Sequence, residues 1–252
     1  ADAVHDLGDS ISIGLAWLLN RLGNKPSDSA FTYGYLRFSV LGALINGFVL
    51  IAGSIWVLSM AIPRLIEPQQ PHAVGMFWLA LLGIAVNGYA AFKLSRGKTL
   101  NERVLNWHLL EDVLGWVAVL IVAVTLLFVN WPILDPLLSI VFTLFILVNV
   151  VRNTLAAVTL LMQRTPDRAL HDSVTKIFLG IEHVIAVHHV HIWSLDGESH
   201  VLTAHLQLGE RVESETVIAI KQEIGRLIGG FNFVHTTIEF EFPEEPCRDE
   251  SQ

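Results

Sequence analysis

Two pairs of side chains in this chain have the types and the spacing of metal ligands. His5 is followed four residues later by Asp9, and His108 is followed four residues later by Asp112. Residues four apart share one face of a helix, so each pair would present an imidazole and a carboxylate together. Two such helices facing each other would offer two nitrogen and two oxygen ligands. A tetrahedral set of this kind suits zinc, with cobalt or cadmium as competitors.

A simpler explanation for each pair is a local hydrogen bond between two side chains that line a water-filled cavity. Because the same pair occurs on two different segments, we favour a shared metal site. Asp6 and Glu111 lie one residue away from the paired faces, and Asn46 lies in an apolar segment between the two pairs. These three residues are candidates for supporting the ligands or relaying protons, with helix packing as the alternative.

The segments that carry and separate these pairs are apolar. Of the 252 residues, 52% are hydrophobic and only 16% are charged, which is unusual for a soluble protein. Asp, Glu, Lys and Arg are absent from 38–63, 68–92, 113–134 and 136–151. Runs of this length cross or nearly cross a hydrocarbon core of about 30 Å. We therefore predict an α-helical membrane domain at 1–163, with five spans at about 1–22, 36–62, 72–94, 102–129 and 135–161.

Lys and Arg residues predict the orientation of these spans, because they collect on the cytoplasmic side of a membrane. They lie after the first, third and fifth spans, whereas the opposite side has only Arg64. The segment at 164–252 is therefore expected in the cytoplasm and Ala1 on the outer side. We further expect one more span before Ala1, which would give six spans with both ends inside, in the inner membrane of a bacterium.

The ligand types also predict how such a site would work. Metal binds the deprotonated forms of imidazole and carboxylate, so metal and protons compete for the same four side chains. Loading metal from the cytoplasm and protons from the outside would exchange one for the other. The phosphate-binding loop of ATP-driven proteins, G-x-x-x-x-G-K-[ST], does not occur. The net charge of −8 and the lack of a basic stripe argue against a nucleic-acid partner.

Three alternatives stay open at this point. Glu111 could serve as the base of an intramembrane metalloenzyme, although no H-E-x-x-H motif occurs. A metal sensor that used its spans only as an anchor would have no need for ionisable pairs in two of them. Export of manganese, iron, cobalt or cadmium by the same kind of protein is the closest rival to zinc export.

Several short motifs resemble those of the cation diffusion facilitator family of zinc transporters, and they extend over the chain apart from that family's first span. Both ligand pairs lie inside such motifs, and the paired H-x-x-x-D spacing is specific. The motifs are A-D-A-V-H-D-L-G-D at 1–9, T-Y-G-Y-L-R at 32–37, A-L-I-N-G at 43–47, N-W-H-L-L-E-D at 106–112, D-P at 135–136 and H-H-V-H-I-W-S-L at 188–195.

The resemblance implies a homodimer that exchanges cytoplasmic zinc for protons by alternating access, and that is not an enzyme. It implies that the transport site is formed by His5, Asp9, His108 and Asp112. Two accessory metal sites found in some relatives are not expected, because the stretches S-D-S-A-F-T-Y-G-Y at 27–35 and K-L-S-R-G-K-T-L-N-E-R at 93–103 contain no histidine.

The segment at 164–252 has the patterns of a small α+β domain. Helix-like spacing of apolar residues covers 168–182 and 214–228, and strand-like alternation covers 187–195, 201–208 and 235–242. Pro166 and Asp167 mark a helix start, and Asp196–Gly197 marks a hairpin turn. The order helix, strand, strand, helix, strand fits the ferredoxin-like cytoplasmic domain of the family.

Histidines gather on the predicted strands. Strict alternation places His189 and His191 on one face of the sheet and His188 on the other. The resemblance implies a cytoplasmic metal site at the dimer interface, where Zn²⁺ would be a bound regulatory or structural ion as well as the transported one. Its ligands would be His188, His205, Glu239 and Glu241. The alternative is a solvated sheet face that binds no metal.

Cys247 is the only cysteine, so an internal disulfide and a cysteine-rich zinc module are both excluded. It follows Pro246 near the end of the chain. Such a residue could be a metal ligand or an exposed thiol, and we favour the exposed thiol.

Overall fold

The computed structural model describes residues 14–15, 18–19, 21–68, 70–94, 100–129 and 131–249, with the backbone alone for residues 94 and 100–112. The chain divides into two compact units. One unit is formed by residues 1–47 together with 153–252, and the other by residues 48–152. His5, Asp6 and Asp9 lie outside the described residues.

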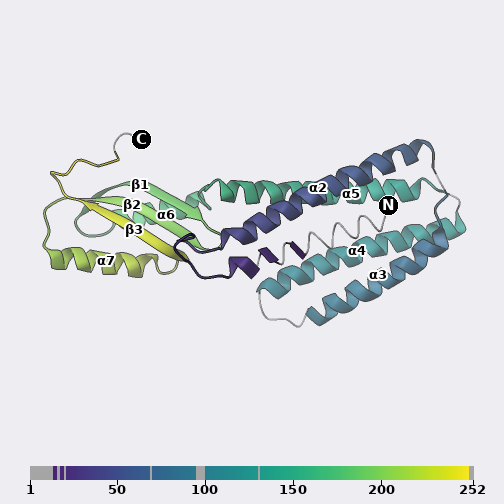
Figure 1. Cartoon of the computed structure of the whole chain (residues 1–252), viewed down its shortest axis with the longest axis horizontal. Helices are drawn as coiled ribbons and strands as arrows, with labels where there is room; N and C mark the ends of the chain where they lie inside the picture. The colour runs from purple at the N-terminus through teal and green to yellow at the C-terminus, as the bar shows by residue number, and fades with distance from the viewer. Residues whose placement is uncertain are drawn as a thin grey trace. The chain divides into compact units, whose positions relative to one another are not determined.

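Long apolar helices dominate the first two thirds of the described chain (Figure 1). They are α2 (Arg37–Ile66), α3 (Ala73–Leu94), α4 (Leu100–Phe128) and α5 (Leu134–Leu161). Among the described residues, α2, α5 and residues Ala73–Lys93 of α3 are each long and apolar enough to cross a membrane. In α4 the apolar part is Val113–Phe128. Large side chains such as Trp56, Trp78 and Phe145 are exposed, as expected for surfaces that face lipid.

Glycines allow the helices of the unit at 48–152 to approach one another closely. α3 and α4 run side by side (Figure 1), and the Trp116 ring of α4 packs directly on Gly83 of α3. Gly115 of α4 faces Phe142 of α5, where an added methyl group would lie 2.6 Å from the ring. Small residues at such contacts let packed helices interlock within a membrane.

Helices α2 and α5 contribute to both units, and they meet within the first unit at Gly47. This glycine lies against the Thr154 side chain and leaves no room for a methyl group. α5 carries Asp135 in its first turn, followed by Pro136. Both residues suit that place, because a carboxylate stabilises the positive end of a helix dipole and proline lacks a backbone donor that the first turn would leave unpaired.

The cytoplasmic domain follows the predicted order of helix, strand, strand, helix and strand (Figure 1). Its elements are α6 (Arg168–Leu179), β1 (Val184–Ser194), β2 (His200–Leu208), α7 (Ser214–Ile228) and β3 (Phe233–Glu241). The strand order is β1-β2-β3, with β1 and β2 antiparallel and β2 and β3 parallel. Asp167 caps α6 by accepting a hydrogen bond from the backbone of Ala169, and Gly197 adopts a φ of 103° in the turn between β1 and β2. The predicted helix start and hairpin turn are thus confirmed.

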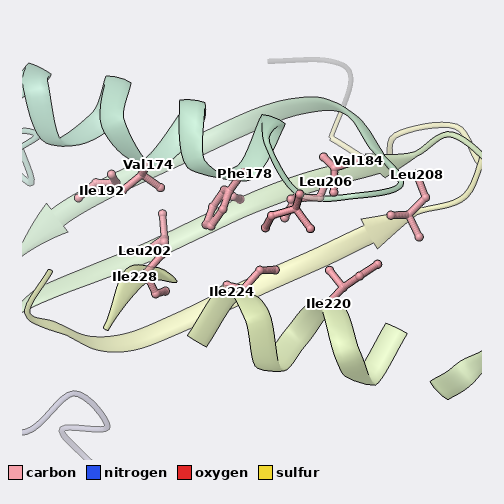
Figure 2. Close-up of a cluster of buried hydrophobic side chains, with 12 residues drawn as sticks. Val174, Phe178, Val184, Ile192, Leu202, Leu206, Leu208, Ile220, Ile224 and Ile228 are labelled. Atoms are coloured by element: carbon pink, nitrogen blue, oxygen red, sulfur yellow. The ribbon is translucent and has the colours of Figure 1, made fainter. Parts of the chain in front are cut away.

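One face of this sheet forms the core of the domain (Figure 2). Leu202, Leu206 and Leu208 alternate along β2 and are buried against Phe178 of α6 and Ile224 of α7. Because alternate residues of a strand point to opposite faces, both helices cover the same side of the sheet. The other face of β2 carries Val201, Thr203 and His205, and this face holds the candidate site.

The segment between residues 24 and 36 rests on that second face. The carboxylate of Asp28 orders it by accepting two backbone hydrogen bonds and the hydroxyl hydrogen bond of Tyr35, at 2.6 Å. Tyr33 lies edge-on to Trp193 of β1 and His235 of β3, with ring centroids 6.3 and 4.9 Å away. The T-Y-G-Y-L-R motif therefore connects the start of α2 to the cytoplasmic sheet.

Candidate metal centre

The predicted transport ligands are only partly within the described chain. His108, Glu111 and Asp112 lie on the backbone of α4, and their side chains are not among those described. Asn46 is half-buried on α2. The pairing of the two H-x-x-x-D motifs across two helices therefore stays a prediction.

A cluster of four potential ligands is fully described in the cytoplasmic domain. It consists of His188 on β1, His205 on β2, Glu241 at the end of β3, and Cys247 in the tail that follows. The sheet register sets His188 opposite His205, and His205 opposite Glu239. Each residue of the cluster offers one ligand atom, and these four atoms all lie within 4.8 Å of one another.

The carboxylate of Glu241 is the centre of the cluster. Its Oε2 lies 2.7 Å from Nε2 of His188, and its Oε1 lies 2.8 Å from Nδ1 of His205. Burial raises the pKa of Glu241, but hydrogen bonds from Cys247, His205 and His188 act in the opposite direction and hold it below its ordinary value. The carboxyl group of Glu241 is therefore ionised at neutral pH.

Cys247 corrects the prediction of an exposed thiol. The side chain is half-buried, and its Sγ lies 3.6 Å from Nδ1 of His205. Burial raises the pKa of the thiol, and the charge of Glu241 beside it raises the pKa further. The tail beyond β3 has no periodic pattern from which the direction of this side chain could be predicted. The only indication in the sequence was that the single cysteine follows closely after two acidic residues of the last strand.

A β-bulge corrects the predicted alternation of histidines on β1. The register shifts between His188 and His191, and His189 adopts a φ of 48°, in the left-handed region. As a result the rings of both His188 and His189 approach His205, with centroids 5.6 and 5.0 Å away. The bulge thus adds a third imidazole beside the cluster.

Glu239 lies at the edge of the cluster. Its Oε2 is 3.8 Å from Nε2 of His205 and accepts a hydrogen bond of 2.9 Å from Arg248. Asp249 lies on the same side, with its Oδ2 3.7 Å from the same His205 nitrogen. The predicted role of Glu239 as a metal ligand stays a prediction.

The donor set of the four-residue cluster fits a divalent metal ion. Zinc binds thiolate sulfur at about 2.3 Å and imidazole nitrogen or carboxylate oxygen at about 2.0–2.2 Å. Ligand atoms that already lie within 4.8 Å of one another need only small side-chain shifts to reach a tetrahedron of that size. One sulfur, two nitrogens and one oxygen suit zinc, cadmium or cobalt better than magnesium or calcium.

Sequence models of two protein families match this chain. The model described as the cation efflux transmembrane domain matches residues 1–162. The model described as the cation efflux protein, cytoplasmic domain, matches residues 166–242. Together the two matches extend over both the apolar helices and the sheet that carries the cluster.

Several curated bacterial proteins are similar over nearly the whole chain. The "Cadmium, cobalt and zinc/H(+)-K(+) antiporter" of Bacillus subtilis is 30% identical over 248 residues, which are 96% of this chain and 79% of that protein. The "Zinc transporter ZitB" of Pectobacterium atrosepticum is 30% identical over 254 residues, 99% of this chain and 78% of that protein. The "Metal cation efflux system protein CzcD" of Cupriavidus metallidurans is 30% identical over 251 residues, 98% and 78% of the two chains.

Proposed function

This chain belongs to the cation efflux family, and we propose that it exports zinc from the cytoplasm in exchange for protons. The family membership confirms the predicted resemblance to the cation diffusion facilitators. The protein is accordingly a membrane-embedded transporter and not an enzyme. It belongs to the inner membrane, and its domain at 166–242 is cytoplasmic.

The observation that carries the proposal is the repeated H-x-x-x-D pair within the matched transmembrane domain. Ionisable side chains within membrane spans are costly, and they persist where they serve transport. We propose that His5 and Asp9 on one helix and His108 and Asp112 on another form a tetrahedral transport site. Asp6, Asn46 and Glu111 are the candidates for supporting it.

The coupling to protons follows from the same four ligands. Metal entering from the cytoplasm displaces protons from imidazoles and carboxylates, and protons arriving from the outside displace the metal. An alternating-access protein that is loaded with either metal or protons needs no other energy source than the proton gradient. The printed name of the Bacillus subtilis relative, an antiporter of metal against H⁺ and K⁺, supports this assignment.

We propose that the cytoplasmic cluster binds a second, resident metal ion in a homodimer. The cluster provides four donor atoms that already lie close together, from His188, His205, Glu241 and Cys247. The carboxylates of Glu239 and Asp249 lie beside them, near His205. The cluster lies on the sheet face opposite α6 and α7, where His188 and Glu239 stay partly exposed, so a second copy of the domain can approach it beside the segment between residues 24 and 36.

Cadmium or cobalt export is the second candidate function. The printed name of the Bacillus subtilis relative includes cadmium and cobalt beside zinc, and that of the Cupriavidus metallidurans relative specifies no metal. A site of two nitrogens and two oxygens accepts all three ions, because their coordination preferences overlap. The same assay decides between them when it is run with each ion in turn.

The test is transport by the complete protein in proteoliposomes with an acidic lumen, where the lumen stands for the outer side. Zinc uptake should require the pH gradient and should fall to the level of empty liposomes in Asp9→Ala and Asp112→Ala, since each variant removes one carboxylate of the site. Cadmium and cobalt uptake should be slower than zinc uptake.

A matched control is Asp167→Ala, which removes a carboxylate at the helix cap of α6 in the cytoplasmic domain. It should leave zinc uptake within about twofold of wild type, because surface caps contribute about 1 kcal/mol to stability and nothing to the transport site. Zinc uptake that persists in both Asp9→Ala and Asp112→Ala would remove the proposed site.

A further inference from the structure

A half-open cavity of about 370 Å³ lies between the helices of the unit at 48–152. All four helices contribute to its wall: Val57 from α2, Met76 from α3, Trp116 from α4 and Phe142 from α5 are examples. A cavity of this size holds several water molecules or a partly hydrated cation. It is not part of the predicted transport site, whose motif on α4 ends at Asp112.

One side of this cavity is polar, and the polar groups come from a single helix. Asp135, Ser139 and Thr143 of α5 line it and are spaced four residues apart, so they form a stripe along one helix face about 12 Å long. Asp135 is the only ionisable side chain among the lining residues. The remaining wall is apolar and includes the ring of Trp116, which packs on Gly83.

The cavity lies in the outer half of the membrane. α5 ends at Leu161 and leads into the cytoplasmic domain at residue 166, so its first turn with Asp135 is at the opposite side. α4 runs the other way, and Trp116 and Val119 of the cavity follow Asp112 by four and seven residues. These positions share one face of α4, which therefore leads from the predicted transport site outward into the cavity.

Asp135 also occupies a favourable place for a purely structural carboxylate, since it lies in the first turn of α5. That role explains neither the cavity beside it nor the hydroxyl groups that continue from it at one-turn intervals. The charged group that acts on Asp135 from α2 is Arg64. His72 directly precedes α3 and lies four residues before Met76, and its Nδ1 accepts a hydrogen bond from the backbone of Gly75.

We propose that this cavity is the outer passage of the transporter and that Asp135 is its proton-accepting residue. The inference rests on the proposed function. Asp135 takes a proton from the outer solution and passes it through water in the cavity, along the hydroxyl stripe, toward the transport site as the metal leaves, and Asp135 returns to its ionised form. One proton enters and one reaches the transport site, so the step needs no other reactant.

The test uses the complete transporter in proteoliposomes with its outer side facing the lumen. Initial zinc flux is measured while the lumen pH is varied at constant bath pH, and zinc binding from the bath side is measured separately. Asp135→Asn should reduce the dependence of zinc flux on lumen pH by about fivefold or more, which is within the usual range of coupling between two sites. The affinity for zinc should be unchanged. Asp135→Glu should keep the response.

Two outcomes would overturn the proposal: a full response to lumen pH in Asp135→Asn, or loss of zinc binding in that variant. The variant Asp112→Asn distinguishes failure of the Asp135 proposal from failure of the proposed transport site. It should abolish zinc binding and zinc flux together, whether or not Asp135 accepts protons.

A labelling experiment does not depend on Asp135 itself. Ser139→Cys should react with a membrane-impermeant thiol reagent confined to the lumen, and zinc export should slow after modification. Phe145→Cys, on an exposed position of the same helix that faces lipid, is the control and should react far more slowly. Cys247 lies on the cytoplasmic side and stays out of reach. Equal reaction rates at the two positions would contradict an aqueous outer passage.

Discussion

At the residue scale, Cys247 changes the chemistry of the cytoplasmic cluster. Two imidazoles and a carboxylate alone would resemble the proposed transport site, whereas an added sulfur ligand favours softer ions such as cadmium and binds zinc more tightly. The raised pKa of Cys247 means that the thiol is protonated at neutral pH. A metal ion therefore has to displace that proton before the sulfur can bind.

Cobalt binding should report this step directly. Since Cys247 is the only cysteine of the sequence, a sulfur-to-cobalt charge-transfer absorption band can come only from this cluster. The apparent affinity for cobalt, which the band reports, should rise with pH by about tenfold per pH unit for each proton released. This rise should end where the pH reaches the pKa of the thiol. In Cys247→Ser the band should be absent. Cobalt binding should also release one proton fewer, so the apparent affinity should change less steeply with pH.

The control for this measurement is Glu244→Gln, which changes an exposed carboxylate of the same tail outside the cluster. It should leave the band and its pH dependence unchanged. If Cys247→Ser retained the full pH dependence of cobalt binding, sulfur would not be a ligand.

The residues of the cluster show how far a sequence predicts a site. His188, His205 and Glu241 were predicted from the family resemblance, and they lie together because the register of a regular sheet fixes which residues become neighbours. Cys247 and the position of His189 were missed for one physical reason. Irregular backbone, here an aperiodic tail and a left-handed residue in a bulge, has no repeating pattern from which side-chain direction follows.

At the element scale, the packing of α2 against α5 depends on Gly47, which belongs to the A-L-I-N-G motif. Gly47→Ala should lower stability by about 1–3 kcal/mol, because a methyl group collides with the Thr154 side chain and forces the helices apart. The measurement is thermal unfolding of the detergent-solubilised transporter.

Gly88→Ala is the matched control for this substitution. Gly88 is also on a membrane helix, α3, but no neighbouring atom lies within 4 Å of the position of an added methyl group. It should leave the midpoint of unfolding unchanged or slightly raised, since alanine is the better helix former. Equal destabilisation by both substitutions would show that the Gly47 contact is not specific.

The elements themselves were more predictable than the site. In the cytoplasmic domain, apolar periodicity correctly distinguished helix from strand at every element, because one face of each must be buried in the same core. The ends were less accurate: β1 begins at Val184 and β3 at Phe233, before the predicted starts at 187 and 235. Backbone pairing extends a strand beyond the residues whose alternation is visible.

At the scale of the whole molecule, the two proposed metal sites use different sets of ligand atoms. The proposed transport site has only nitrogen and oxygen ligands, so metal can be exchanged readily against protons. The cytoplasmic cluster has a thiol and a buried carboxylate, which suit a resident ion. The segment that includes Tyr33 contacts the same sheet and continues into α2, so the cytoplasmic domain is physically linked to a membrane helix.

The most direct test of proton-coupled zinc export is the movement of protons that zinc itself drives. Proteoliposomes of the complete transporter are prepared with equal pH and equal potassium on both sides and with the membrane potential clamped, and zinc is added on the cytoplasmic side. Exchange predicts that the lumen becomes more alkaline as zinc enters, and that Asp112→Ala abolishes both changes. Zinc entry through the wild-type protein with no change of lumen pH would contradict it.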